Sequence, residues 1–375
     1  MMANALYLAE LSLAGLTDWL AAQGEPAYRA KQIYRHLYHG LAEDFSQMTD
    51  LPVALRDRLG QAVLLNPLRL LAEQRSADGQ TRKALFELPD GQTIESVLML
   101  YGPGGTGDVV QDRDAEKRPR RTVCLSTQVG CAMGCAFCAT GKSGLQRSLT
   151  VGEIVAQTLY FARELRKEDP AAGLTNLIYA GMGEPLVNYE ATVESVHRLN
   201  DPVGFGLGAR HMTISTAGWV PGIQRLASEG LQVGLAVSLH APDDALRSRL
   251  MPINRRYPVS ELMAACREYV ERTGRRVSFE YILIAGVNAA VDQARKLASL
   301  LRGMLCHVNL IPMNPVEGVG WQPPARVAVR AFERVLAEAG IAVTVREERG
   351  SDIRAACGQL RARRTARTTD AGVPA

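Results

Sequence analysis

The pattern that most constrains the fold of this chain is a regular alternation of short apolar runs with longer helical stretches. The apolar runs fall near residues 121–127, 175–180, 212–216, 233–240, 277–284 and 306–312. Segments of helical periodicity lie near 150–167, 189–200, 221–229, 258–273, 290–303 and 325–339. Repeated strand–helix units with short connections build a parallel sheet covered by helices. Six units are fewer than the eight that close a full barrel. We therefore predict an α/β fold, an open, partial (β/α)6 TIM-like barrel with a further strand over 341–347.

The segments on either side of the repeat follow different patterns. Residues 1–65 are predicted to be helical, because apolar and aromatic residues recur at spacings that one helix face can use. Alternating residues on both sides of the turn Pro89-Asp90-Gly91 predict a β-hairpin. We expect a small N-terminal helical domain over 1–65, a short β-hairpin extension and linker over 66–110, the barrel over 111–350, and a C-terminal segment with a disordered tail over 351–375.

Three cysteines in one short loop indicate a metal cofactor. Cys131, Cys135 and Cys138 have the spacing C-x3-C-x2-C in a stretch rich in Gly and Ala, which lets the backbone wrap closely around a bulky group. Three thiolates can hold three irons of a [4Fe–4S] cluster and leave the fourth iron open to a small ligand. Two alternatives stay open on these residues alone: a zinc site completed by Cys124, since structural zinc favours four closed ligands, and cysteines that only pack.

The cysteine loop resembles the signature loop of radical S-adenosylmethionine (SAM) enzymes, in which the amino and carboxylate groups of SAM chelate the open iron. The other unusual motifs also fall where predicted strands end, and sites in parallel barrels form at those ends. Polar and glycine residues there are candidates to bind SAM. These candidates are Gly183, Glu184, Ser215, Ser238, Leu239, His240 and Asn314. The alternative for each is a turn or capping role, and His240 taken alone is more often a satisfied histidine at the barrel rim.

Composition and charge exclude several classes of protein. A hydrophobic content of 47% and a charged content of 22% are typical of globular chains, and no apolar run has membrane-spanning length. The N-terminus lacks the pattern of a signal peptide, so seven cysteines indicate a reducing cytoplasm with metal or redox chemistry. The net charge is +4, and its arginine clusters suit phosphate backbones or are solvated surface. The clusters are Arg118, Arg120 and Arg121; Arg247, Arg249, Arg255 and Arg256; and Arg361, Arg363, Arg364 and Arg367.

From about residue 20 to residue 360 the chain resembles the RlmN/Cfr family of radical SAM RNA methyltransferases. The resemblance rests on Gly24-Glu-Pro-Ala-Tyr-Arg-Ala-Lys-Gln-Ile-Tyr, Ile94-Glu-Ser-Val-Leu, the block from Cys124 to Gly141, Gly181-Met-Gly-Glu-Pro-Leu-Val-Asn, Ile214-Ser-Thr-Ala-Gly, Val237-Ser-Leu-His-Ala-Pro, Ile311-Pro-Met-Asn-Pro and Ser351-Asp-Ile-Arg-Ala-Ala-Cys-Gly-Gln-Leu. It implies methylation of an adenosine ring carbon in RNA: carbon 2 in 23S rRNA and, in some members, an adenosine in tRNA. Methylation at carbon 8, as in the Cfr branch, stays open; we favour carbon 2 because the N-terminal segment looks closer to RlmN.

The resemblance also implies a role for each reactive residue. Cys357 would carry a methyl group taken from one SAM, a second SAM on the cluster would supply a radical, and Cys124 would release the product by forming a transient disulfide. Glu95 would accept a proton, although a lone strand glutamate is about as often a surface residue. Cys266 and Cys306 fit packing roles instead. For Cys357 the alternative is a buried thiol in a C-terminal helix.

Partners follow from the same resemblance. An RNA substrate and an electron donor such as flavodoxin or ferredoxin are expected, with no membrane and a monomer as the default. Arg29, Lys31 and Arg35 stand near tyrosines, so the N-terminal domain either grips RNA or only packs on the barrel. Two other classes stay open: a non-catalytic zinc protein that binds RNA, and a radical SAM enzyme that acts on a protein or a small molecule.

Overall fold

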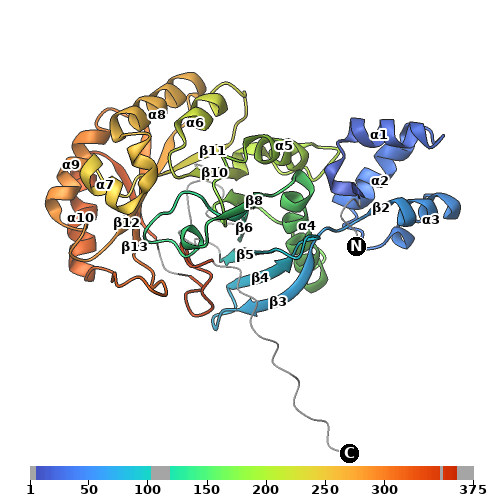
Figure 1. The fold of residues 1–375 in the computed structure, drawn as a ribbon, viewed down its shortest axis with the longest axis horizontal. Helices are drawn as coiled ribbons and strands as arrows, with labels where there is room; N and C mark the ends of the chain where they lie inside the picture. Colours follow the sequence, from blue (N-terminus) through green and yellow to red (C-terminus); the bar gives the residue numbers. More distant parts are fainter. Residues whose placement is uncertain (1–5, 103–118, 347–348, 361–375) are drawn as a thin grey trace, which may run out of the picture.

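The computed structural model describes residues 6–102, 119–346 and 349–360, and one ten-stranded sheet organises them (Figure 1). The strand order is β14-β13-β12-β11-β10-β9-β6-β5-β4-β3. Residues 103–110 of the predicted extension and linker, Arg118, and residues 361–375 of the predicted C-terminal segment, with their four arginines, lie outside the described residues. Within the described residues, no helix is both long and apolar enough to cross a bilayer.

Seven of these strands form the parallel part of the sheet, as the repeat predicted. They are β6 (Arg120–Leu125), β9 (Asn176–Tyr179), β10 (Met212–Thr216), β11 (Gly234–Ser238), β12 (Val277–Leu283), β13 (Cys306–Pro312) and β14 (Ala342–Val345). In the described part of the chain β14 pairs with β13 only, so the barrel stays open. The predicted open barrel with an added edge strand is confirmed.

Helices cover the outer face of the parallel strands (Figure 1). They are α4 (Val151–Glu168), α5 (Tyr189–Asn200), α6 (Val220–Leu226), α7 (Asp244–Leu250), α8 (Val259–Thr273), α9 (Val291–Leu301) and α10 (Arg326–Glu338). Thr150 and Glu153 form a capping box at the start of α4. The sequence did not predict α7, because a helix of two turns shows too little periodicity; an Asp243 cap on the Leu246 amide begins it.

The predicted hairpin region continues the barrel sheet. It forms β3 (Arg69–Arg75), β4 (Thr81–Glu87) and β5 (Thr93–Tyr101), and β5 runs antiparallel to β6. β5 therefore lies edge to edge with the first barrel strand, in the same sheet. Two shorter strands, β7 (Gln128–Gly130) and β8 (Leu145–Ser148), form a hairpin that encloses the cysteine loop, which ends in the 3-10 helix η4 (Thr140–Ser143).

The N-terminal residues form a small helical unit on one side of the barrel (Figure 1). Its elements are β1 (Leu6–Tyr7), η1 (Leu8–Glu10), α1 (Leu13–Ala22), α2 (Tyr28–Tyr38), η2 (Phe45–Gln47), α3 (Val53–Ala62) and β2 (Val63–Leu64). Two buried arginines attach it to the barrel helices. Arg163 of α4 donates to the carbonyls of Leu41 and Ala42, and Arg198 of α5 donates to the carbonyls of residues 9–11. These bonds give partners to backbone carbonyls at the contact between the N-terminal unit and the barrel helices.

Candidate active site

A cavity of about 280 Å³ lies inside the open barrel and gathers residues from distant parts of the chain. Of the residues predicted for the site, all except Glu95 and Leu239 line it. The predicted residues that line it are Cys124, Cys131, Cys135, Cys138, Gly183, Glu184, Ser215, Ser238, His240, Asn314 and Cys357. The motifs at the strand ends therefore converge on one cavity, because the carboxyl ends of parallel strands lie on the same side of the sheet.

The cysteine loop is held in shape by backbone contacts at its two ends. The amide of Cys131 donates to the carbonyl of Gly144 over 2.9 Å. Gly130 has φ +76°, and a Cβ there would lie 1.8 Å from the same carbonyl oxygen, so only glycine fits. Farther along, the amide of Ala136 donates to the carbonyl of Leu250. The three thiols are thus fixed at one wall of the cavity.

The donor set of this loop fits an iron–sulfur cluster. Burial raises the pKa of the Cys131 thiol to about 12 and the pKa of Cys135 well above its usual value, so a cation is needed to hold both as thiolates. No three His, Cys, Asp or Glu side chains in residues 6–102, 119–346 and 349–360 converge on a single-ion site. In a cluster each thiolate binds a different iron, so the cysteines need not point at one atom. A closed tetrahedral zinc site suits this arrangement less well.

Gly183 and Glu184, in the loop after β9, form the cavity wall next to the cysteine loop. Gly183 has φ +104°, and a Cβ there would lie 2.6 Å from the Cβ of Gln128. The carboxylate of Glu184 accepts from the amide of Leu186 over 3.1 Å and from the amide of Ala217 over 2.6 Å. Burial raises the Glu184 pKa to about 7. Glu184 therefore ties the loop after β9 to the loop after β10, with one of these hydrogen bonds on each of its oxygens.

His240 after β11 is a neutral hydrogen-bond donor at the cavity wall. Its Nδ1 accepts from the amide of Ile282 over 3.0 Å, so the neutral ring carries its proton on Nε2. Burial lowers the His240 pKa to about 3. The ring packs edge-on against Phe137 of the cysteine loop, with 4.7 Å between centroids. His240 is thus a satisfied histidine that also lines the cavity, whereas its neighbour Leu239 is fully buried in the core.

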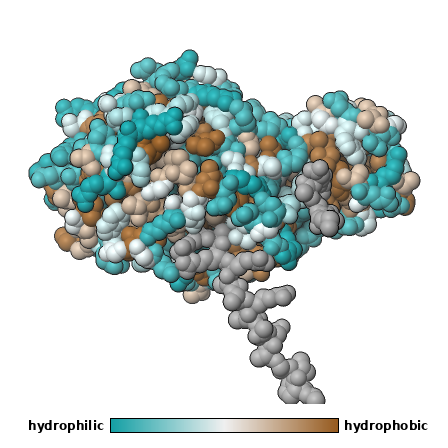
Figure 2. Space-filling view, in the orientation of Figure 1, coloured by the Kyte–Doolittle hydropathy of each residue, from teal (hydrophilic) through white to brown (hydrophobic). Residues whose placement is uncertain are grey.

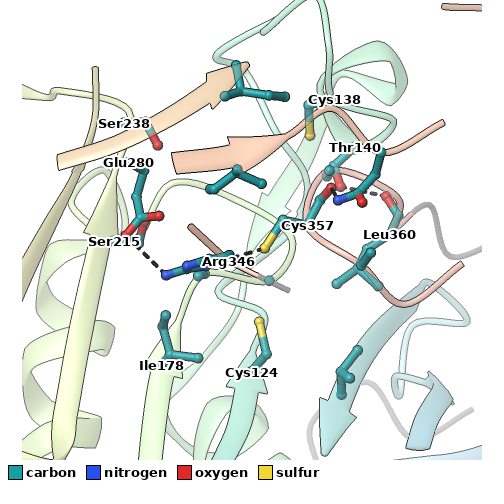
Figure 3. Close-up of a pocket in the computed structure, with 18 of the residues that line it drawn as sticks. Cys124, Cys138, Thr140, Ile178, Ser215, Ser238, Glu280, Arg346, Cys357 and Leu360 are labelled. Atoms are coloured by element: carbon teal, nitrogen blue, oxygen red, sulfur yellow. Dashed lines mark hydrogen bonds and ion pairs between the residues drawn. The ribbon is translucent and has the colours of Figure 1, made fainter. Parts of the chain in front are cut away.

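Cys124 and Cys357 point into the same space from opposite sides (Figure 3). Cys124 belongs to β6, and burial together with the nearby Cys357 raises the pKa of Cys124 to about 12. Cys357 lies in an exposed turn. The C-terminal segment is held across the cavity by hydrogen bonds: Asn314 donates to the carbonyl of Cys357 over 3.2 Å, and Thr140 donates to that of Leu360 over 2.6 Å. The alternative of a buried thiol in a C-terminal helix is wrong for this turn.

Two charged residues beside Cys357 were missed by the sequence reading. The Arg346 guanidinium lies 3.8 Å from the sulfur of Cys357 and 3.1 Å from the carboxylate of Glu280 (Figure 3). Asn309 of β13 also donates to Glu280, over 2.9 Å. A signal for Glu280 was present, because a charged residue within an apolar parallel strand needs a partner.

Glu95 lies on β5 and does not line the cavity itself. It is 7% exposed, and its carboxylate forms a 3.0 Å ion pair with Lys83 of β4. Side chains alternate along a strand, so Glu95 shares the face of β5 that carries the cavity-lining Val97 and Met99. Lys83 also donates to the carbonyl of Arg354, three residues before Cys357, over 3.3 Å. The remaining cysteines, Cys266 and Cys306, are buried and do not line the cavity.

The tyrosines of the N-terminal unit are divided between core and surface. Tyr34 and Tyr38 are buried in its core, whereas Tyr28 is 55% exposed with the Arg29 guanidinium 4.8 Å from its ring centroid. Of these three rings on α2, only Tyr28 is available to stack on a partner.

Comparisons with known proteins agree with this geometry. The family model of the radical SAM superfamily matches residues 125–298, and that of the ribosomal RNA large subunit methyltransferase N-terminal domain matches residues 6–65. A probable dual-specificity RNA methyltransferase RlmN of Chloroflexus aurantiacus is 50% identical over 98% of this chain and 96% of its own. The equivalent protein of Moorella thermoacetica is 52% identical over 90% and 92%. A crystal structure of a radical SAM methyltransferase from Sphaerobacter thermophilus is 52% identical, covers 96% of this chain and all of its own, and superposes with a TM-score of 0.88.

Proposed function

This chain belongs to the RlmN family of radical SAM RNA methyltransferases, and we propose that it methylates carbon 2 of an adenosine in 23S rRNA. The observation that carries the proposal is the placement of two thiols, Cys124 and Cys357, in the cavity that also contains the three-cysteine loop. A simple hydrogen-abstracting enzyme would not need this second pair of thiols. The relatives are named dual-specificity RNA methyltransferases, which supports an adenosine in tRNA as a second substrate.

The cavity residues divide into a cluster site and a SAM site. Cys131, Cys135 and Cys138 would hold a [4Fe–4S] cluster. Bound there, the cluster and SAM would supply a radical that removes a hydrogen atom. The residues proposed to contact SAM are Gly183, Glu184, Ser215, Ser238, Leu239, His240 and Asn314. Glu184 would also shape this site, because each of its carboxylate oxygens accepts from a backbone amide, and we propose that Leu239, whose side chain is buried, contributes through its backbone.

Cys357 and Cys124 would act in sequence as carrier and releasing thiol. Cys357 is the exposed thiol, and the cationic Arg346 beside it stabilises a thiolate that can accept a methyl group from SAM. After loss of a hydrogen atom, the carbon on Cys357 would form a bond to the adenine ring carbon, that ring carbon would lose its proton, and the adduct would return one electron to the cluster in place of the one spent on SAM cleavage. Cys124, held as a thiol by burial, would then attack the sulfur of Cys357: an S–S bond would form as the S–C bond breaks, and the thiol proton would pass to the released carbon and complete the methyl group.

Glu95 is proposed to accept the proton that the ring carbon loses. Its carboxylate is held 3.0 Å from the ammonium of Lys83, and this ion pair fixes its position on β5. The bond from Lys83 to the carbonyl of Arg354 links this base to the segment that carries Cys357. We propose that residues 1–65 contact the RNA and that residues 66–110 form the extension that carries Glu95. Residues 111–350 would form the barrel, and residues 351–375 the segment that carries Cys357.

The product of the reaction tests the proposed function directly. The chain would be reconstituted anaerobically with iron and sulfide and incubated with SAM, dithionite and a 23S rRNA fragment, and its nucleosides analysed by mass spectrometry. We expect 2-methyladenosine. A product of 8-methyladenosine would move the enzyme to the Cfr branch, and SAM cleavage without methylated adenosine would reject the RNA substrate. Zinc in place of iron and sulfide would favour the non-catalytic class. In the cell we propose that it acts in the cytoplasm as a monomer, with flavodoxin or ferredoxin as reductant.

Replacing Glu95 by glutamine should slow RNA methylation by about 100-fold, the typical contribution of a positioned base. Glutamine keeps an oxygen that can accept from Lys83, so the fold should be retained. Single-turnover rates of RNA product would be compared with the rate of Cys357 methylation, which should not change. Glu87→Gln, on the neighbouring strand β4, is the matched control. Equal rates for Glu95→Gln and wild type would show that Glu95 is not the base.

A further inference from the structure

Three exposed arginines lie together on the segment between β11 and α8. Arg249 is on α7, and Arg255 and Arg256 are in and after the 3-10 helix η6 (Pro252–Arg255). We call these three residues the arginine patch. The sequence grouped them with Arg247 as a candidate for phosphate binding, but the structure separates the four.

Arg247 has a structural role. It is fully buried and donates to the carbonyls of Ala217, Ser238 and Leu239 over 2.7–3.1 Å. It also donates to the side chain of Asn254 over 3.0 Å. Burial lowers its pKa to about 10, so it is still charged at neutral pH. Arg247 therefore holds the loops after β10 and β11 together and supports the segment that carries the patch.

The patch keeps its positive charge at the surface. In the ranges that the structure describes, none of the three guanidiniums pairs with an acidic side chain. The acids of the same segment are engaged elsewhere: Asp243 caps α7 and pairs with Lys296, and Asp244 accepts from Asn254 and from the amide of Val259. The segment thus presents three exposed arginines that form no ion pair within the described residues.

The patch borders the cysteine loop and the mouth of the cavity. The carbonyl of Leu250 accepts from the amide of Ala136 over 2.9 Å, and Met251 lines the cavity. Figure 2 shows hydrophilic side chains over the part of the face where Figure 1 labels α7. A ligand seated on the patch would therefore extend to the site where the chemistry is proposed.

An aromatic side chain supports one of the cations. The Arg256 guanidinium lies 4.8 Å from the ring centroid of Trp219 and 5.4 Å from that of Tyr257. Trp219 is partly exposed and follows Ala217, which lines the cavity. Stacking on a ring fixes the guanidinium plane and leaves its edge free to donate hydrogen bonds, a combination common on surfaces that bind nucleic acid.

We propose that Arg249, Arg255 and Arg256 bind the RNA phosphates that flank the target adenosine. This inference rests on the proposed function, because a base that enters the cavity must leave its stack and its flanking backbone must be held at the rim. Guanidiniums match phosphate oxygens in geometry and charge, and each neutralised phosphate contributes to affinity in a salt-dependent way. Trp219 orients Arg256 and acts as a positioning residue.

The test compares RNA binding by two triple variants of the reconstituted enzyme. The patch variant is Arg249→Gln, Arg255→Gln, Arg256→Gln. The control is Arg295→Gln, Arg330→Gln, Arg334→Gln, which removes the same charge from the exposed faces of α9 and α10. Affinity for a fluorescein-labelled 23S rRNA fragment would be measured by anisotropy at several salt concentrations. Iron content and circular dichroism would establish that both variants fold.

For the patch variant we expect affinity to fall by about 10- to 100-fold, and the slope of log affinity against log salt to decrease by about 2, for three phosphate contacts. The control should change affinity by less than about 3-fold. If the triple variant folds poorly, the single variants Arg255→Gln and Arg256→Gln are measured instead. Each should lower the logarithm of the affinity, and the salt slope, by about a third of the change expected for the triple variant.

Three outcomes would overturn the proposal. The first is an unchanged affinity and salt slope in the patch variant, and the second is an equal loss of affinity in the control variant. The third is unchanged RNA binding together with slower reduction of the cluster by an acidic electron carrier, which would assign the patch to a protein partner. Failure of the proposed function is distinguishable from these results. A wild-type enzyme that forms no methylated adenosine but binds RNA through the patch would reject the methylation proposal and support the binding surface.

Discussion

Replacing Cys357 by alanine should abolish RNA methylation while the iron–sulfur cluster is retained. Cys357 is the exposed thiol of the cavity, and the proposed reaction passes the methyl carbon through its sulfur. Alanine has no atom that can carry this group, so the expected loss is complete. The measurement is 2-methyladenosine formed per chain, with iron content determined for both proteins and methylated Cys357 determined for the wild type by mass spectrometry.

The controls for this variant are the two cysteines outside the cavity. Cys266→Ala and Cys306→Ala remove buried thiols of α8 and β13, so each should lower stability by about 1–2 kcal/mol and leave product formation unchanged. Methylation by Cys357→Ala would exclude the carrier mechanism. Loss of methylation in a folded Cys266→Ala or Cys306→Ala variant would contradict the packing role of that residue.

Replacing Cys135 by alanine should abolish cluster binding and all SAM cleavage. A [4Fe–4S] cluster that three protein thiolates hold is lost when one of these ligands is removed, because the iron that this thiolate held is then exposed to solvent. Iron and sulfide content and visible absorbance measure the cluster, and 5′-deoxyadenosine measures SAM cleavage. Both should fall to background.

The variant Cys124→Ala, measured in the same way, distinguishes an iron–sulfur cluster from a zinc site. Cys124 is the fourth ligand of the alternative zinc site, so its loss should release the metal if that site exists. In the cluster assignment it lies opposite Cys357, and Cys124→Ala should keep full iron content and accumulate RNA bound to Cys357. Retention of iron by Cys135→Ala, or its loss in Cys124→Ala, would reject the cluster assignment.

The sequence was sufficient for features that neighbouring residues encode. The positions of the seven parallel strands and of six of the seven helices that cover them follow from periodicity, and the capping box of α4 from four consecutive residues. Convergence of the strand-end motifs on one cavity followed from the parallel topology alone, since that topology places all carboxyl ends on one side. The short helix α7 was missed because a side-chain cap, and no long pattern, begins it.

The tertiary structure decided how these parts meet. The β3–β5 strands read locally as a hairpin, and only pairing between β5 and β6 joins them to the barrel. That pairing brings the Glu95 face beside the cavity, and Lys83 next to Glu95. The placement of Cys357 opposite Cys124 likewise depends on hydrogen bonds from Asn314 and Thr140, far from it in sequence.

The arginines of the segment from 247 to 256 show this division most clearly. Their sequence reads as one basic cluster, yet Arg247 is fully buried on backbone carbonyls and the other three are exposed. The sequence by itself determined the barrel, the cysteine loop and the candidate thiols, because spacing and periodicity are properties of adjacent residues. Only the tertiary structure decided which charges are buried and which thiols meet, because burial and contact depend on residues that the chain brings together from a distance.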